Sequence, residues 1–316
     1  MQAPLDLWLA DLRIRHAFLV VGRLGGSAGV QIDPAGAAAG FHYCLNGPCF
    51  VAMAGQEPTR LDEGDFLFMR DRMDHVVWSS APRCTTPRAL RSLVPTLQKD
   101  GAVCFSIGSE PQDRLILGGG FCMESAEARH FIDALPPVFC VRHGAPYTER
   151  LRTIMDELVG EATAAGPGAS PVVARLAEVA VLIGVRSFAS TGGEGSPLLE
   201  AARDPRLGRA IEAIHKDPAE PWTIARLGKI AGMSRSGFAA EFTVAVGETP
   251  AAYIARARMA RAERLLVEHD WPLPKIAEAV GYSSAAAFSV AFKRLRRVPP
   301  SAVRRPRGQG ASTGAA

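Results

Sequence analysis

One pattern occurs twice in the last third of the sequence, and its two copies lie 50 residues apart. Each copy has a serine, two phenylalanines spaced four residues apart, and then a proline. The copies are Ser234, Phe238, Phe242 and Pro250, and then Ser284, Phe288, Phe292 and Pro300. Aromatic residues at i and i+4 lie on one face of a helix, so the repeat predicts two copies of one helical unit.

An apolar helical run and a tight turn of small residues precede the phenylalanines in each copy. The runs and turns are Ile224, Leu227, Ile230 with residues 231–233, and Ile276, Ala277, Val280 with residues 281–283. A short helix, a Gly-containing turn and a second helix held by its inner face form a helix-turn-helix. Two such units, joined by one long helix, would place two reading helices about one turn of DNA apart.

Helix start signals fall where two such units need them. The capping candidates are Thr223, Ser234, Thr249 and either Ser283 or Ser284. Pro250 follows a capping residue and suits the first helical position, which predicts a connecting helix to about residue 268. Residues 271–274 are expected to end that connection and to begin the next helix.

The outer faces of the two reading helices follow from burial of the phenylalanines. The side chains that could contact base edges are Arg235, Ser236, Ala239, Ala240, Ala285, Ala286, Ser289 and Val290. Arg235 is the best suited to guanine, because its guanidinium can match O6 and N7 together. The serines can bond to a base or to a phosphate, whereas the alanines can only contact thymine methyl groups.

Basic residues gather at the end of the second reading helix, where phosphate contact is the expected role. The phosphate candidates are Thr223, Lys293, Arg294, Arg296 and Arg297. Helix N-termini at Thr223 and Pro274 could also meet phosphates, since the first N–H groups of a helix attract anions.

The net charge of +4 conceals an asymmetry along the chain. Residues 204–308 contain 18 Lys and Arg against 10 Asp and Glu, and the totals of 36 and 32 leave 18 against 22 elsewhere. A basic C-terminal part suits a polyanion such as double-stranded DNA. A length of 316 residues favours two domains, with room for a helical connector.

Neither a membrane segment nor a signal peptide is predicted. No apolar run reaches the ~18 residues of a membrane span, and residues 1–6 contain an acid and no basic segment. We therefore expect a cytoplasmic protein. The six cysteines form no Cys-x-x-Cys, which favours reduced thiols. A redox sensor is an alternative, because Cys84 follows Arg83 and Cys140 lies near Arg142 and His143.

The first part of the chain consists of short β-type runs separated by Gly, Pro and Asp. The clearest runs are residues 18–21, 41–45, 49–53, 66–69, 76–78 and 114–117. Residues 46–47, Asn-Gly, are a hairpin signal, and the three glycines at 118–120 are expected to turn the chain after a last strand. Frequent short strands of this kind predict a sandwich or barrel.

Helical periodicity returns at residues 146–191, in two amphipathic stretches with a Gly- and Pro-containing break. This helical pair could pack on the barrel of its own chain or pair with its copy in a second subunit. Residues 192–197 are typical of a short flexible linker. The expected parts are a sheet-rich domain (1–145), a helical connector (146–196), two helix-turn-helix units (197–306) and a disordered tail (307–316).

The motif residues of the C-terminal part extend beyond the phenylalanines. They are residues 225–234 (ARLGKIAGMS), 247–253 (GETPAAY), 276–284 (IAEAVGYSS) and 291–294 (AFKR). This segment resembles the arabinose-regulator (AraC/XylS) family of transcription regulators. Arg297 stands where the family usually has Gly, and Val303 where it has an aromatic residue. The resemblance implies a promoter-binding regulator, often an activator that contacts RNA polymerase, tuned by a sensor domain.

Two N-terminal segments resemble the cupin motifs. They are residues 41–47 (FHYCLNG) and residues 61–69 (LDEGDFLFM) with His75 following. The resemblance implies a barrel with His42 and His75 pointing inward, as candidates for a sensor pocket. Cupin enzymes normally supply two close histidines and a glutamate, but only His42 stands in the first motif. We therefore expect no required cofactor, and a metal held by His42 and His75 is the less favoured alternative.

Together these predictions describe an α+β multidomain protein: an N-terminal cupin-like β-barrel, a helical connector and a C-terminal all-α tandem helix-turn-helix domain. The expected function is a transcription regulator, not an enzyme, that binds promoter DNA and senses a small molecule or chemical signal. RNA polymerase is the expected second partner, and a homodimer is open. The alternatives are a cupin metalloenzyme with a DNA-binding domain and a thiol-based redox-responsive regulator.

Overall fold

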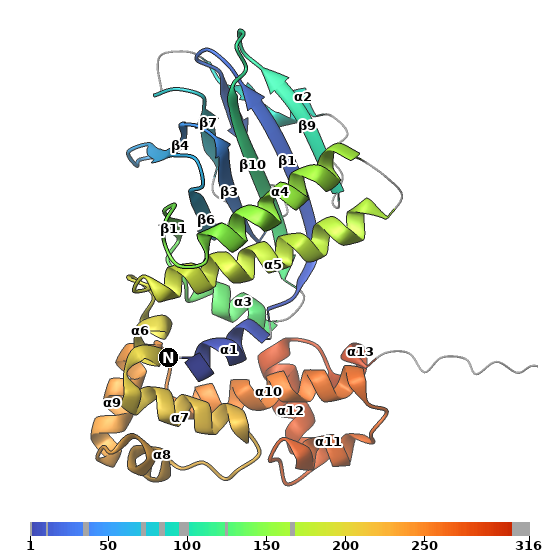
Figure 1. Ribbon diagram of the computed structural model, residues 1–316. Helices are drawn as coiled ribbons and strands as arrows, with labels where there is room; N and C mark the ends of the chain where they lie inside the picture. The colour runs from blue at the N-terminus through green and yellow to red at the C-terminus, as the bar shows by residue number, and fades with distance from the viewer. Residues whose placement is uncertain are drawn as a thin grey trace, which may run out of the picture. The chain divides into compact units, whose positions relative to one another are not determined.

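The computed structural model describes residues 2–10, 12–33, 38–70, 74–81, 86–94, 101–123, 126–164 and 168–304 (Figure 1). It divides into two compact units. The sheet unit is Leu5–Glu200, and the helical unit is Ala201–Ala316 together with Met1–Pro4. The predicted tail at 307–316 lies outside the described residues.

The sheet unit contains two β-sheets. The six-stranded sheet has the order β11-β6-β3-β10-β1-β9 and the five-stranded sheet the order β5-β4-β7-β2-β8. The strands of the first are β1 (Ile14–Leu24), β3 (Ala39–Asn46), β6 (Phe66–Arg70), β9 (Gly101–Ile107), β10 (Arg114–Met123) and β11 (Val138–Val141). Those of the second are β2 (Gly29–Ile32), β4 (Cys49–Met53), β5 (Thr59–Leu61), β7 (His75–Trp78) and β8 (Arg88–Ala89).

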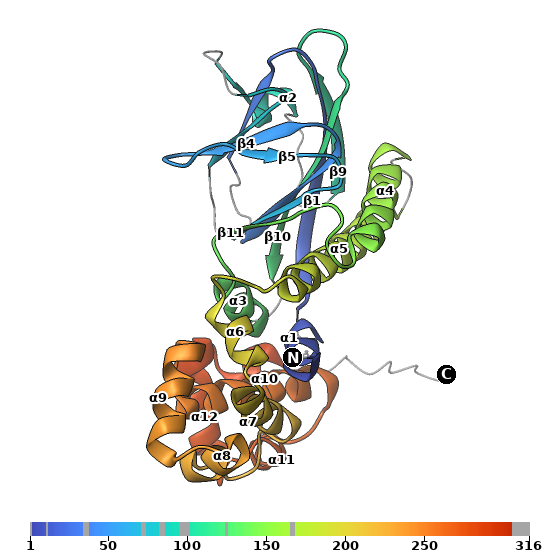
Figure 2. The ribbon, with the colours of Figure 1, turned by 60° about the vertical axis from the view of Figure 1, so that its left-hand side comes forward.

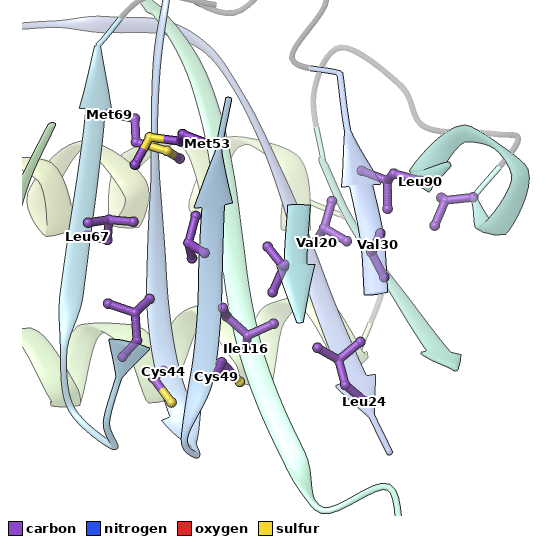
Figure 3. Packing of buried hydrophobic residues seen from close by; sticks show 14 residues of the cluster. Val20, Leu24, Val30, Cys44, Cys49, Met53, Leu67, Met69, Leu90 and Ile116 are labelled. Atoms are coloured by element: carbon purple, nitrogen blue, oxygen red, sulfur yellow. The ribbon is translucent and has the colours of Figure 1, made fainter. Parts of the chain in front are cut away.

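The two sheets share one apolar core. Residues of the first sheet, such as Leu67 and Ile116, pack in one buried cluster with residues of the second, such as Met53 and Val77. Figure 3 shows side chains of this cluster, among them Leu67, Ile116 and Met53, between the strands. Alternation along each strand explains the arrangement, since every second side chain points into this layer. The predicted cupin-like sheet architecture is confirmed.

Helices cover the opposite face of the six-stranded sheet. The helices of this part are α1 (Gln2–Ala10), α2 (Leu90–Leu93), α3 (Ala126–Asp133), α4 (Thr148–Ala164) and α5 (Ala169–Ser190). Helices α4 and α5 pack against each other and against β1 and β9 (Figure 2). Gly184 lets α5 lie close to Phe66 of β6, because a Cβ at this position would be 2.5 Å from the Phe66 ring. The helical pair α4 and α5 therefore packs on the sheet of its own chain.

Two predictions about the strands are wrong. Strand β10 continues through the three glycines to Met123, and β11 follows it. A Cβ at Gly118 or Gly119 would lie 3.0 Å from His42 or 2.5 Å from Phe41, so these glycines make room for side chains of β3. Residues 46–47 do not close a hairpin, because β3 pairs with β6 and β10 whereas β4 pairs with β5 and β7.

The helical unit contains two helix-turn-helix modules. Its helices are α7 (Pro205–Lys216), α8 (Ile224–Ala231), α9 (Arg235–Val246), α10 (Pro250–Glu268), α11 (Leu273–Ala279), α12 (Ala285–Arg296) and α13 (Pro300–Val303), and α6 (Pro197–Arg203) precedes them. The first module is α8 with α9, and the second is α11 with α12. Helix α10 packs against both, as predicted for the connecting helix (Figure 1).

Side-chain caps begin five of these helices: Asp204 caps α7, and the other four caps are ones that the sequence predicts. The capping bonds run to Thr223 from Arg226, to Ser234 from Gly237, to Thr249 from Ala252 and to Ser284 from Ala287. Ser284, rather than Ser283, therefore caps the second reading helix. Each such bond satisfies an N–H group that the helix itself leaves unbonded, and contributes about 1 kcal/mol.

The two reading helices end in the same way, although their sequences differ there. Gly247 follows α9 with a φ of +82°, and Arg297 follows α12 with a φ of +63°. The repeat therefore keeps its left-handed C-terminal turn without the glycine that favours this conformation. Val303 packs against the core of the second module, in the place of the expected aromatic residue.

Arg297→Gly is expected to raise the free energy of unfolding by about 1 kcal/mol, because glycine adopts a positive φ without the steric cost of a Cβ. The matched control is Gly247→Ala, where a new Cβ meets nothing within 4 Å, so that only backbone strain acts. It should lower stability by about the same amount. Urea unfolding measures the stability of both variants. Equal stability of Arg297→Gly and wild type would show that the backbone at Arg297 is not strained.

Candidate nucleic-acid interface and barrel pocket

Buried aromatic rings set the rotation of both reading helices. Phe238, Phe242, Phe288 and Phe292 are all fully buried. In the first module, Phe242 contacts Phe238 at 5.3 Å and Tyr253 at 5.4 Å between ring centroids. In the second, Phe288 lies 5.5 Å from Phe292 and 5.9 Å from Tyr282. Because one face of each helix is buried in this way, the opposite face must be exposed.

The exposed face of α9 carries most of the predicted base-reading residues. Arg235, Ser236 and Ala240 are exposed, and Ala239 is half-buried. The sequence analysis missed Val244, whose side chain is 82 % exposed. Its spacing of eight residues from Ser236 places it on the same helix face, and that spacing was the signal available in the sequence.

The predicted base-reading positions on α12 are more apolar than those on α9. Ala286 is exposed and Val290 is 70 % exposed, while Ala285 and Ser289 are half-buried. The Ser289 hydroxyl donates to the Ala285 carbonyl of its own helix at 2.7 Å. The exposed face of α12 therefore offers methyl groups, which are complementary to the methyl group of thymine.

One of the predicted phosphate residues is not on the surface. The Arg296 side chain is 5 % exposed, and its Nε lies 2.7 Å from Glu263 Oε1 on α10. The prediction of phosphate contact is therefore wrong for Arg296, which instead joins α12 to the connecting helix. The reason is helical geometry, since Arg296 follows Phe292 by four residues and lies on its buried face.

The other phosphate candidates are exposed. Lys293, Arg294 and Arg297 lie at the C-terminal end of α12, and Thr223 lies at the start of α8. The Thr223 hydroxyl accepts from the Arg226 N–H at 3.1 Å, so it serves as the cap. Arg226 also lies over the Trp222 ring, with 4.5 Å from Cζ to the ring centroid.

A second candidate site lies between the two sheets. His42 on β3 and His75 on β7 are both buried, and their Nε2 atoms are 2.7 Å apart. One ring must donate and the other accept, so at least one of them is neutral. Burial, and then the charge of His75, hold the pKa of His42 well below its ordinary value.

The His42 ring borders a small cavity of about 20 Å³. Its other lining residues are aliphatic or glycine apart from Phe105, and include Val30, Val77 and Gly118. The Nδ1 atom of His42 is buried and has no hydrogen-bond partner among the described residues. Both histidines are buried, and His42, but not His75, lines the cavity and brings a polar atom to it.

The residues present do not fit a cupin metal centre. Among the described residues, no group of three or more His, Cys, Asp or Glu side chains could hold a metal ion. A structural or catalytic zinc site needs at least three protein ligands. The two histidines bond to each other instead.

Two of the described thiols, Cys44 and Cys140, are in surroundings that disfavour the thiolate. A hydrogen bond with Cys49, followed by burial, raises the pKa of Cys44. Burial raises the pKa of Cys140 to about 12, against the smaller opposite effect of Arg142. Since the thiolate is the reactive form, the redox prediction built on Cys140 gains no support. Cys84 lies outside the described residues.

Comparison with known proteins assigns each of these two sites to a known domain family. A cupin family profile matches residues 3–190, and a helix-turn-helix domain profile matches residues 227–306. An AraC-like transcription regulator of Streptomyces lividans is 32% identical over 307 residues, which span 94% of this chain and 96% of that protein. The chain belongs to the AraC-like transcription regulators.

A second AraC-like regulator, of Streptomyces antibioticus, is 33% identical over 94% of this chain and 96% of its own length. Among solved structures, the DNA-binding domain of the transcriptional factor AdpA in complex with a target DNA is 26% identical. It covers 31% of this chain and 87% of its own chain, with a TM-score of 0.30. As an AraC-like regulator, the chain combines a cupin-type N-terminal domain with a DNA-binding helical domain.

None of the helices in the described part of the chain has the length and apolarity that a membrane span requires.

Lowering the pH is expected to destabilise the sheet unit through His42. Because the pKa of His42 is lowered by folding, the unfolded chain binds its proton first. Stability is therefore complete above pH ~6.5 and falls below it, by at most about 1.4 kcal/mol per pH unit. His42→Gln should have a shallower dependence in urea unfolding. His215 titrates in both wild type and His42→Gln, so its contribution cancels when the two are compared. Identical slopes of stability against pH would show that His42 is not responsible for the pH dependence.

Proposed function

We propose that α9 and α12 enter neighbouring major-groove segments of promoter DNA and read it with their exposed faces. The observation that carries this proposal is the burial of the phenylalanine pair on each helix, which leaves both outer faces exposed. A major groove accepts one α-helix, and two in tandem need two groove segments on one side of the duplex.

The polar and the apolar side chains on these two faces would read different features of the bases. Arg235 supplies the hydrogen-bonding fork for a guanine, whereas Val244 and Val290 supply exposed methyl groups for thymine. The remaining candidates on these faces are Ser236, Ala239, Ala240, Ala285, Ala286 and Ser289. Lys293, Arg294 and Arg297 would contact phosphates, and with Thr223 at a helix start they position the protein without selecting sequence.

Arg235→Ala is expected to lower affinity for a duplex selected from a random pool by the wild-type protein. The loss should be about 1–3 kcal/mol, and the preference for guanine should relax at one base pair. Fluorescence anisotropy with single-base variants of the duplex measures both effects. Unchanged preference at every position would show that Arg235 is not a base reader.

Lys293→Ala is the matched control, since it removes a positive charge without removing a base contact. It should weaken binding to all duplexes alike and reduce the slope of log K against log salt by about 0.9. Arg296→Ala should behave differently, because its guanidinium is bound to Glu263. Its main effect would be a lower stability of the second module.

We propose that the barrel cavity receives the signal, as a compact molecule with one hydrogen-bonding group. The support is the buried Nδ1 of His42 at the edge of an apolar cavity. At about 20 Å³ the cavity holds one or two water molecules, so a larger effector would have to displace side chains. In a ligand-observed NMR screen, fragments should bind wild type and not His42→Leu, and equal binding to both would refute the pocket.

Regulation rather than catalysis is the role we propose, with activation through contact with RNA polymerase, as in the family that the chain resembles. Two exposed valines on α5, Val172 and Val179, support pairing with a second copy. They lie seven residues apart and so on one helix face. Analytical ultracentrifugation should then show a dimer that Val179→Glu dissociates, and a wild-type monomer would refute the pairing.

A further inference from the structure

One side chain in the middle of the connecting helix α10 bonds both to the turn that leads into the first module and to the turn inside the second module. The guanidinium of Arg258 donates to the carbonyl of Pro218 from Nε at 2.8 Å and to that of Glu220 from Nη2 at 3.0 Å. A longer contact of 3.5 Å joins Nη2 to the Ala219 carbonyl. These three carbonyls belong to the turn between α7 and α8, which leads into the first module.

The same guanidinium also reaches the second module. Its Nη1 donates to the carbonyl of Gly281 at 3.2 Å, in the turn between α11 and α12. The Arg258 side chain is half-buried. Its contacts are therefore internal, with a planar set of donors spread over two turns that lie more than 60 residues apart in the sequence.

An independent observation places these two turns in direct contact. Gly281 has a φ of +78°, and a Cβ built there would lie 2.4 Å from the Ala219 carbonyl oxygen. The same Cβ would lie 3.0 Å from the Ala219 Cα and carbonyl carbon. Backbone atoms cannot move aside as a flexible side chain can. Only glycine at position 281 therefore lets the turn of the second module lie this close to the turn between α7 and α8.

We infer that Arg258 and Gly281 form an inter-module lock, which fixes the separation and the angle between α9 and α12. Arg258 is thus a positioning residue, which selects DNA by spacing without contacting it. This inference rests on the proposed function, in which both helices occupy the major groove at once. DNA repeats every 10–10.5 base pairs over about 34–36 Å, so adding one base pair shifts a half-element by about 3.4 Å and rotates it by about 35°.

A rigid pair of readers cannot follow such a shift, whereas a loosely joined pair can. The wild-type protein should therefore accept one spacing between the two half-elements and lose at least about tenfold in affinity when one base pair is added or removed. Without the lock, the best spacing should bind less tightly and the neighbouring spacings should bind nearly as well. Loss of preorganisation explains both changes, because the two modules must then be ordered on binding.

The experiment uses the full chain and a duplex selected from a random pool by the wild-type protein. The half-elements are located by single-base substitution, and a series of duplexes then carries from two base pairs fewer to two base pairs more between them. Dissociation constants are measured at one salt concentration for wild type, Arg258→Met, Arg258→Lys and Gly281→Ala. Arg264→Met is the matched control, since Arg264 is an exposed arginine on the same helix.

For Arg258→Met we expect about tenfold weaker binding at the best spacing, with a one-base-pair penalty below about threefold. Arg258→Lys, which keeps the charge and fewer donors, should be intermediate. Gly281→Ala should also flatten the spacing profile, whereas Arg264→Met should keep the wild-type profile. Thermal unfolding shows which variants are folded. If Arg258→Met is not folded, the spacing profile of Gly281→Ala or Arg258→Lys tests the lock in its place.

A folded Arg258 or Gly281 variant that keeps the full spacing penalty would overturn the lock, even if its affinity fell equally at every spacing. A different result addresses the proposed function itself. If wild type bound a single half-element as tightly as two, or bound no duplex, then reading by both modules would be wrong whatever the variants did.

Discussion

The burial of two phenylalanine pairs is the interaction on which the helical unit depends. Each pair packs its helix against neighbouring elements, through Tyr253 of α10 in the first module and Tyr282 in the second. Fully burying side chains of this size contributes about 1.5–3 kcal/mol each, more than any single surface contact of these helices. The hydrophobic effect therefore determines which face of α9 and of α12 is available, and the chemistry of that face determines which bases it can select.

Positive charge in this unit has two separate uses. Arg256, Arg258 and Arg296 are held by protein groups: Glu248, four backbone carbonyls and Glu263 respectively. Lys293, Arg294 and Arg297 are exposed at the end of α12. An excess of basic residues is consistent with a polyanionic partner, but only burial separates the arginines that build the fold from those that face solvent. The connecting helix illustrates this, since Arg256 and Arg258 join α10 to the elements on either side, whereas Arg264 is exposed.

Local pattern was enough to predict the helical unit almost completely. The repeat and the caps at Thr223, Ser234 and Thr249 are set by neighbours within a few residues, whereas the left-handed turn at Arg297 has no glycine to announce it. The sheet unit was predicted less well, because strand pairing joins distant segments. The glycines at 118–120 look like a turn in the sequence, and their role emerges only when β3 supplies His42 and Phe41 opposite them. The misassignment of Arg296 was avoidable, because its spacing of four residues from Phe292 places it on the buried face of α12, although its partner Glu263 is distant in the sequence.

The central claim is that two aromatic-anchored modules present their outer faces to successive major-groove segments of one duplex. Methylation protection of guanine N7 tests it most directly, because N7 lies in the major groove. On a duplex selected by the full chain, the account predicts two clusters of protected guanines on one side of the DNA, about 10 base pairs apart. Protection confined to a single cluster, or binding without any protection of N7, would contradict it.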